Sequence, residues 1–165
     1  MPNFFGSTML PVPLNLAELA TLVREIAEDE SFWRPHLQLP HGHSRRWTRL
    51  WTDPDVDVWL LSWLPDQATE LHDHGPSAAA FTVVSGLLAE TRLRAGRTVT
   101  QDCAAGTTVW LAPGVLHDVR GGGDGPTVSV HAYSPPLTRM TYYDPTGRTV
   151  LRTVETTEPE EELAR

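Results

Sequence analysis

The sequence predicts an all-β fold class: an antiparallel barrel or a two-sheet jelly roll, preceded by a short helical segment. From residue 47 onward, the chain divides into short stretches rich in β-branched and aromatic residues, separated by Gly, Pro or Asp clusters. The 14 prolines and 12 glycines favour many strands and turns over a bundle of helices. The predicted strands are 47–51, 56–63, 78–86, 87–94, 107–112, 127–134 and 149–154.

The length of 165 residues is that of one domain, and no linker or internal repeat divides the chain. We expect a single domain over residues 1–155, with its helical part at 14–37 and its β-barrel at 45–155. The last residues, 156–165, contain the acidic run EPEEE, which predicts a disordered tail.

The first helix is predicted to begin after Asn15, because Asn15 can cap it and Glu18 completes a capping box three residues later. Apolar residues then recur at helical spacing through about Asp29, which gives the helix one apolar face. A second, shorter helix is expected over Glu30–Leu37, with Pro35 interrupting it.

The net charge of −8 argues against a nucleic-acid-binding protein, because the only basic cluster is a short one at Arg45, Arg46 and Arg49. No stretch reaches the ~18 apolar residues that a membrane span requires. Cys103 is the single cysteine, so no disulfide can form within the chain. We therefore expect a cytoplasmic protein without nucleic-acid or membrane partners, acting as a monomer, with a weak dimer as the alternative.

His72 and His74 are spaced i and i+2, so on an extended segment both imidazoles point to one side while Asp73 points away. Two such imidazoles form half of a transition-metal site, and ordinary surface polarity is the alternative. His41 and His43 have the same spacing but lie among Pro, Gly and Ser, which predicts a loop without a metal site.

A third histidine completes the predicted site. A strand that begins after Gly106 ends in the turn at Pro113 and Gly114, and this turn delivers His117 onto the next strand. In a jelly roll the two hairpins stack, so His117 can face the other two histidines.

This arrangement resembles the two cupin motifs, so we expect a cupin jelly-roll barrel. Three positions depart from the motifs: the proline is displaced to Pro113, Gly121 replaces the final asparagine, and Ala79 replaces the glutamate. The metal would therefore be held by three neutral histidines and no carboxylate. The matching positions are His72, His74, Gly86, Gly106, Gly114 and His117.

Within the cupins, the sequence resembles cysteine dioxygenase. The resemblance lies in four separate sequence segments, 72–77, 83–91, 114–119 and 129–137. The resemblance implies Fe(II) on the three histidines and oxidation of L-cysteine by O2 to cysteine sulfinic acid. The resemblance therefore implies that the molecules bound by the protein are a small thiol substrate and O2. Three imidazoles also accept manganese, nickel or zinc, so the residues by themselves leave the metal open.

Ser129, His131 and Tyr133 are spaced i, i+2 and i+4, so they share one face of a strand. The alternative to a functional role is a half-buried strand whose polar residues are satisfied by their neighbours. The resemblance implies a hydrogen-bonded relay, with the Tyr133 phenol near the substrate and oxygen and with His131 and Ser129 orienting it.

The resemblance also implies that Arg49 grips the carboxylate of the substrate, since Arg binds carboxylates in bidentate fashion. Arg45 or Arg46 is the alternative for this role. Trp47 stands where the family usually has tyrosine, so one contact to substrate or oxygen is absent. Asp73 is expected to brace a histidine from behind.

Trp47 also supports an alternative substrate, another small thiol such as 3-mercaptopropionate. A third reading is a cupin that binds a metal or ligand without turning it over.

Overall fold

The computed structural model describes residues 10–43 and 45–156. Helix α1 spans Leu16–Glu28, and the predicted capping box is present: Asn15 Oδ1 accepts from the Glu18 amide and Glu18 Oε2 accepts from the Asn15 amide. Leu19 and Val23 point from this helix into the protein and are fully buried. The expected acidic tail falls almost entirely in 157–165, outside the described residues.

The second predicted helix is split in two. Helix α2 covers only Glu30–Trp33, and a 3-10 turn, η1, covers Arg34–His36. Pro35 lies inside that turn, where it cannot donate the amide hydrogen bond that would continue an α-helix.

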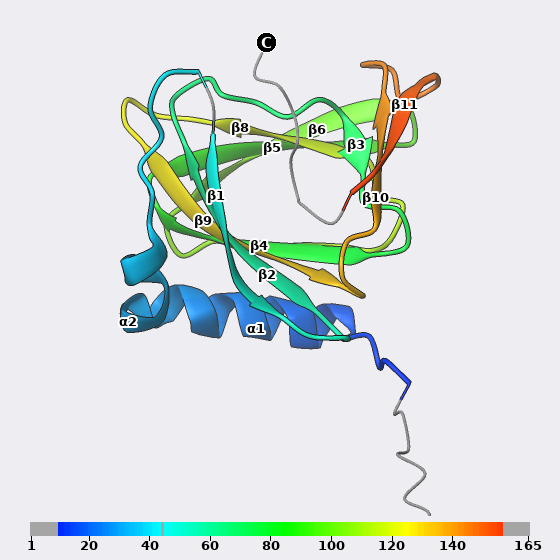
Figure 1. Ribbon diagram of the computed structural model, residues 1–165. Helices are drawn as coiled ribbons and strands as arrows, with labels where there is room; N and C mark the ends of the chain where they lie inside the picture. Colours follow the sequence, from blue (N-terminus) through cyan, green and yellow to red (C-terminus); the bar gives the residue numbers. More distant parts are fainter. Residues whose placement is uncertain (1–9, 44, 157–165) are drawn as a thin grey trace, which may run out of the picture.

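Eleven strands follow in the described part of the chain, and they form two antiparallel sheets (Figure 1). The five-stranded sheet has the order β1-β2-β9-β4-β7, and the six-stranded sheet has the order β11-β10-β3-β8-β5-β6. The strands are β1 Arg46–Thr52, β2 Asp57–Trp63, β3 His72–Asp73, β4 Ala78–Ser85, β5 Leu87–Arg94, β6 Arg97–Ala104, β7 Thr108–Leu111, β8 His117–Gly121, β9 Thr127–Ser134, β10 Arg139–Tyr143 and β11 Val150–Glu155.

The expected all-β architecture with a helical N-terminal segment is confirmed, but the sheets do not close into a barrel. Strand β7 ends one sheet and β6 ends the other, although the two strands are consecutive in the chain. The molecule is therefore an open two-sheet sandwich, and one of its seams runs between β6 and β7.

The five-stranded sheet separates two apolar cores. Helix α1 packs against its outer face, where Val130 and Ala132 of β9 meet Leu19 and Val23 (Figure 1). The second core lies between the sheets and is built largely from aromatic and aliphatic side chains of the inner faces. Because strand side chains alternate, each central strand contributes to both cores.

Two glycines at positions of the cupin motifs are required by packing: Gly86, which matches the motif, and Gly121, which replaces an asparagine. Gly86 has φ +84°, and a Cβ there would lie 2.4 Å from Thr127 Oγ1. Gly121 has an ordinary backbone conformation, but a Cβ there would lie 2.3 Å from the Leu64 carbonyl oxygen. The Gly121 amide and carbonyl also bond to the loop that follows Leu64, at Gln67 and Asp66. The glycine that replaces the motif asparagine thus allows this loop to lie directly against β8.

No helix in the described ranges is both long enough and apolar enough to cross a membrane.

Candidate metal centre and its surroundings

The structure brings the three predicted histidines together between the sheets. His72 lies in β3, His74 follows that strand, and His117 begins β8, directly opposite His72 in the antiparallel pair. All three side chains are buried, and one nitrogen from each lies within 4.8 Å of the others. Within the described residues, no other group of histidines, cysteines or carboxylates meets this criterion.

Hydrogen bonds on the far side of two rings fix which nitrogen faces the centre. His72 Nδ1 lies 2.6 Å from the Glu70 carbonyl oxygen, and His117 Nδ1 lies 3.1 Å from Glu90 Oε1. Both oxygens only accept, so each Nδ1 carries the hydrogen and each Nε2 presents a lone pair. His72 Nε2 and His74 Nε2 are 3.2 Å apart, a separation that two nitrogens bound to one ion at about 2.1 Å can span.

The site keeps the imidazoles of His72 and His74 neutral. The pKa values of His72 and His74 lie well below the ordinary value. Burial is the main cause, and positive charge on neighbouring residues is the second. Neutral imidazoles retain the lone pairs that a transition metal needs. The cluster therefore offers the imidazole donors that a transition metal binds.

Glu90 supports His117, a role that the sequence analysis did not assign. Its side chain is fully buried on β5 and accepts from His117 Nδ1, from Arg92 Nε at 2.8 Å and from Gln101 Nε2 at 2.6 Å. Burial raises the pKa of Glu90, but these three donors outweigh it, so the pKa lies below its ordinary value. A carboxylate thus orients one of the three histidines from behind.

Asp73 does not brace a histidine, contrary to expectation. Its carboxylate accepts from the Tyr143 hydroxyl at 2.8 Å and from the Gly75 amide at 2.9 Å. The alternation of side chains on β3 turns Asp73 away from the centre, toward β10.

Ser129, His131 and Tyr133 all lie on the inner face of β9, as their spacing predicts. Ser129 Oγ is 2.8 Å from His131 Nε2, and the His131 ring stacks on Phe81 with centroids 5.0 Å apart. Burial is the main cause that lowers the pKa of His131 to about 3, so this ring is neutral. The Tyr133 ring lies against that of His74, with centroids 5.0 Å apart.

Trp63 extends this row and was not singled out from the sequence. Its indole Nε1 donates to Ser129 Oγ at 3.0 Å, which leaves the Ser129 hydroxyl hydrogen available for His131. Only the position of Trp63 beside Ser129 in the folded chain reveals this hydrogen bond.

A small cavity between the sheets joins the histidine cluster to this row. Its wall includes the three histidines, His131 and Tyr133, together with Ala79, which occupies the motif's glutamate position. Among the described residues that line the cavity, none is a carboxylate. The three imidazoles that would hold a metal and the Tyr133 side chain therefore line the same space.

Arg49 and Trp47 lie on the inner side of β1, next to Trp59 of β2. The Arg49 guanidinium stands 4.4 Å over the Trp59 ring, and its Nε is 3.9 Å from Asp57 Oδ1. Trp47 meets Trp59 edge to face, with centroids 5.3 Å apart. Arg49 is more than one-third exposed, so it stands at the rim of the sandwich.

Arg45 points toward the histidines, whereas Arg46 does not. Its guanidinium lies 4.6 Å over the ring of Trp63, and its positive charge contributes to the low pKa of His72 and of His131. Arg46 points the other way and bonds to His41. Of the three arginines in this basic cluster, Arg45 and Arg49 therefore face the inner side.

Cys103 lies in strand β6, and it is fully buried. Burial, with nearby acidic groups, raises the pKa of its thiol to about 11, which keeps it protonated and unreactive.

Comparison with solved structures shows the fold. A conserved protein with a double-stranded β-helix domain from Klebsiella pneumoniae is 18% identical, with a TM-score of 0.58 over 67% of this chain and 93% of its own. A Thermus thermophilus protein is 18% identical, with a TM-score of 0.55 over 62% of this chain and 93% of its own. A cupin superfamily protein from Desulfitobacterium hafniense is 10% identical, with a TM-score of 0.50 over 58% of this chain and 81% of its own. The expected cupin fold is therefore confirmed.

The sequence profile described as cysteine dioxygenase type I matches residues 12–146, well over half of the chain. The match includes α1, both sheets except β11, and every histidine of the cluster. The chain belongs to the cysteine dioxygenase type I family.

Proposed function

We propose that the protein is an iron-dependent thiol dioxygenase that oxidises L-cysteine with O2 to cysteine sulfinic acid. The observation that carries this proposal is the cluster of His72, His74 and His117: three buried imidazoles around a cavity whose described lining contains no carboxylate. Within a cysteine dioxygenase family, such a neutral donor set suits a substrate that brings its own negative charge as a thiolate. We place the reaction in the cytoplasm, where thiols are kept reduced.

The reaction balances without another reagent. Both atoms of O2 join the sulfur of one thiolate, and the product is a sulfinate with the same charge. Bound Fe(II) would supply the position where sulfur and oxygen meet and would stabilise the thiolate. The chain's own residues then have to hold the metal, orient the substrate and manage hydrogen bonds to the reacting groups.

His117 and His72 are proposed ligands whose orientation is defined, because their Nδ1 atoms bond to Glu90 and to the Glu70 carbonyl oxygen. Tyr133 is the proposed catalytic residue, since its ring lies beside His74 and lines the same cavity. Its phenol would donate a hydrogen bond to the reacting sulfur or oxygen. His131 and Ser129 are proposed as positioning residues, held by Phe81 stacking and by the Trp63 indole.

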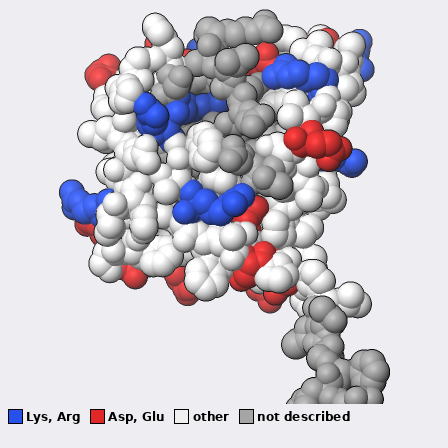
Figure 2. All heavy atoms as spheres, in the orientation of Figure 1, with Lys and Arg blue, Asp and Glu red and all other residues white. Residues whose placement is uncertain are grey.

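The substrate carboxylate needs a cation at the rim. Figure 2 shows arginine side chains on the face that carries β1, while acidic side chains gather along the edge where α1 lies. Arg49 is proposed to bind the carboxylate, in line with the family resemblance, and Arg45 is the alternative because its charge reaches the histidines.

A second candidate function is dioxygenation of another small thiol, such as 3-mercaptopropionate. Trp47 favours it, because an indole packed on Trp59 replaces a hydroxyl that would contact the substrate or oxygen. Both substrates have a carboxylate that the same arginine would bind, but 3-mercaptopropionate lacks the amine of cysteine.

One experiment separates these readings. Protein loaded with Fe(II) is supplied with cysteine, 3-mercaptopropionate or cysteamine, and O2 uptake and the sulfinate product are measured. Uptake with cysteine alone supports the first proposal, and preferential uptake with 3-mercaptopropionate supports the second. Uptake with cysteamine, which lacks a carboxylate, would remove Arg49 from the site. No uptake with any thiol at full iron load would show a cupin that binds without turnover.

A further inference from the structure

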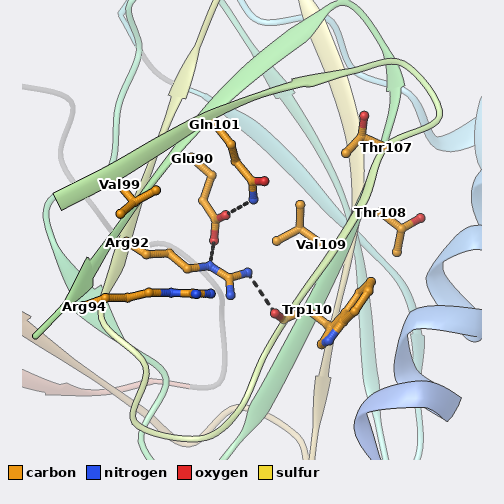
Figure 3. A pocket seen from close by; sticks show the side chains of 9 residues that line it. All are labelled: Glu90, Arg92, Arg94, Val99, Gln101, Thr107, Thr108, Val109 and Trp110. Carbon is orange, nitrogen blue, oxygen red and sulfur yellow. Dashed lines mark hydrogen bonds and ion pairs between the residues drawn. The ribbon is translucent and has the colours of Figure 1, made fainter.

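A second cavity of the protein is separate from the one at the histidine cluster. It lies at the seam where the two sheets fail to close, between β5 and β6 on one side and β7 on the other (Figure 3). Its volume of about 400 Å³ is that of a small-molecule pocket. We call it the seam pocket, and its lining includes Glu90, Arg92, Arg94, Val99, Gln101 and Val109.

The polar wall of the seam pocket comes from one face of β5. Glu90, Arg92 and Arg94 alternate along this strand, so their side chains point to the same side. Arg92 is largely buried, and it is fixed by Glu90 Oε1 and by the Trp110 carbonyl oxygen, each 2.8 Å away. Figure 3 shows the Arg94 side chain extending into the pocket below that of Arg92.

The charges of this wall do not cancel. Glu90 offsets one guanidinium, and Arg94 makes no hydrogen bond or ion pair with any described residue, which leaves one positive charge in excess. Arg92 has five N–H donors, of which two are used by its described partners. Val99, which pairs with Arg92 across the β5–β6 hairpin, and Val109 on β7 add apolar surface beside these donors, and Thr107 and Thr108 also line the β7 wall.

We propose that the seam pocket binds a small organic monoanion, a carboxylate attached to a short apolar chain, through Arg94 and the remaining donors of Arg92. A carboxylate matches the planar donor pattern of guanidinium and would neutralise the excess charge. The apolar part would lie against Val99 and Val109. A dianion would fit poorly, because the Glu90 carboxylate already forms the floor of the pocket.

The position of this pocket gives it a direct connection to the metal centre. Glu90 accepts from Arg92 on the pocket side and from His117 on the metal side. The two sites therefore share one buried carboxylate while using different guanidiniums: Arg94 and Arg92 here, Arg45 and Arg49 at the rim of β1.

The test is a titration of zinc-loaded, ¹⁵N-labelled protein with butyrate, followed by the shifts of backbone amide resonances. Zinc is chosen because it is diamagnetic and binds to imidazole donors. Saturable shifts are expected at residues 94, 99 and 109, and butyramide, the neutral analogue, should not reproduce them. Arg94→Gln should weaken butyrate binding about tenfold, as expected for loss of a charge-assisted contact.

Arg97→Gln is the matched control, because Arg97 lies just beyond the β5–β6 turn but does not line the pocket. It should leave the dissociation constant of butyrate unchanged. Shifts confined to β1 and the histidine cluster, an equal affinity in the Arg94 variant, equally tight binding of butyramide, or no saturable shift would each overturn the proposal.

Discussion

The two faces of strand β9 differ completely in what their side chains do. The inner face presents Ser129, His131 and Tyr133 toward the histidine cluster, whereas the outer face presents Val130 and Ala132 to helix α1. All five residues are buried, so depth alone does not distinguish the two sets. The outer face is packed by apolar contact, and the inner face is ordered by hydrogen bonds and ring contacts.

This contrast shows how one strand serves stability and chemistry at once. Successive residues of β9 point in opposite directions, so each residue that packs against helix α1 is followed by one that faces the histidine cluster. Substitutions on the helix side should therefore lower the free energy of unfolding without changing metal content. Substitutions on the inner side should change metal binding or turnover and leave the free energy of unfolding near the wild-type value.

The largest effect is expected for His117→Ala, on the inner side. Loss of one of three imidazoles should lower iron affinity by more than about 100-fold, since even supporting residues cost up to that much. Iron content after dialysis measures it, and His43→Ala, which removes an exposed histidine, is the control. An unchanged iron content in the His117 variant would remove this residue from the ligand set.

On the helix side, Leu19→Ala should destabilise the protein by about 3 kcal/mol, because it opens a cavity at a fully buried position. Urea denaturation measures the change, and Leu39→Ala, at an exposed leucine, should cost little. Iron content per folded protein should stay at the wild-type level. A loss of iron would show that the two faces are coupled.

Tyr133→Phe should keep the iron and slow turnover about 100-fold, the lower end of what a positioned proton donor contributes. The control is Tyr142→Phe, since Tyr142 is also buried beside a histidine ring but its hydroxyl donates to Met140 sulfur. Initial rates of O2 uptake measure both variants. Equal rates for wild type and the Tyr133 variant would leave the phenol without a catalytic role.

The smallest effect is expected for Glu90→Gln, which should weaken iron binding about tenfold by loosening His117. Competition with a chelator measures the affinity. Asp73→Asn is the matched control, because Asp73 bonds to Tyr143 and Gly75 and not to a ligand. If both variants bind iron equally well, Glu90 does not orient the centre.

Much of the fold was predictable because its signals are local. The capping box of Asn15 and Glu18 and the period-2 pattern of β9 depend only on neighbouring residues. The motif spacing likewise led to the expectation that His72, His74 and His117 share one site, and the structure places them together.

The unpredicted parts depend on how distant strands align. Glu90 reaches His117 because β5 pairs with β8 in a particular register, and Trp63 reaches Ser129 because β2 pairs with β9. The available signal was a glutamate and two arginines alternating with other residues along β5, where apolar side chains would be expected on the inner face. No sequence pattern indicated that β6 and β7 would end different sheets and leave a seam between them.

The close contact at Gly121 has an evolutionary consequence. Because the Leu64 carbonyl oxygen occupies the space of a side chain at 121, this position and the segment from Leu64 to Gln67 can change only in concert. Relatives that carry asparagine at this position should therefore have a different loop before the first histidine, and a pattern search that insists on asparagine would miss proteins built like this one.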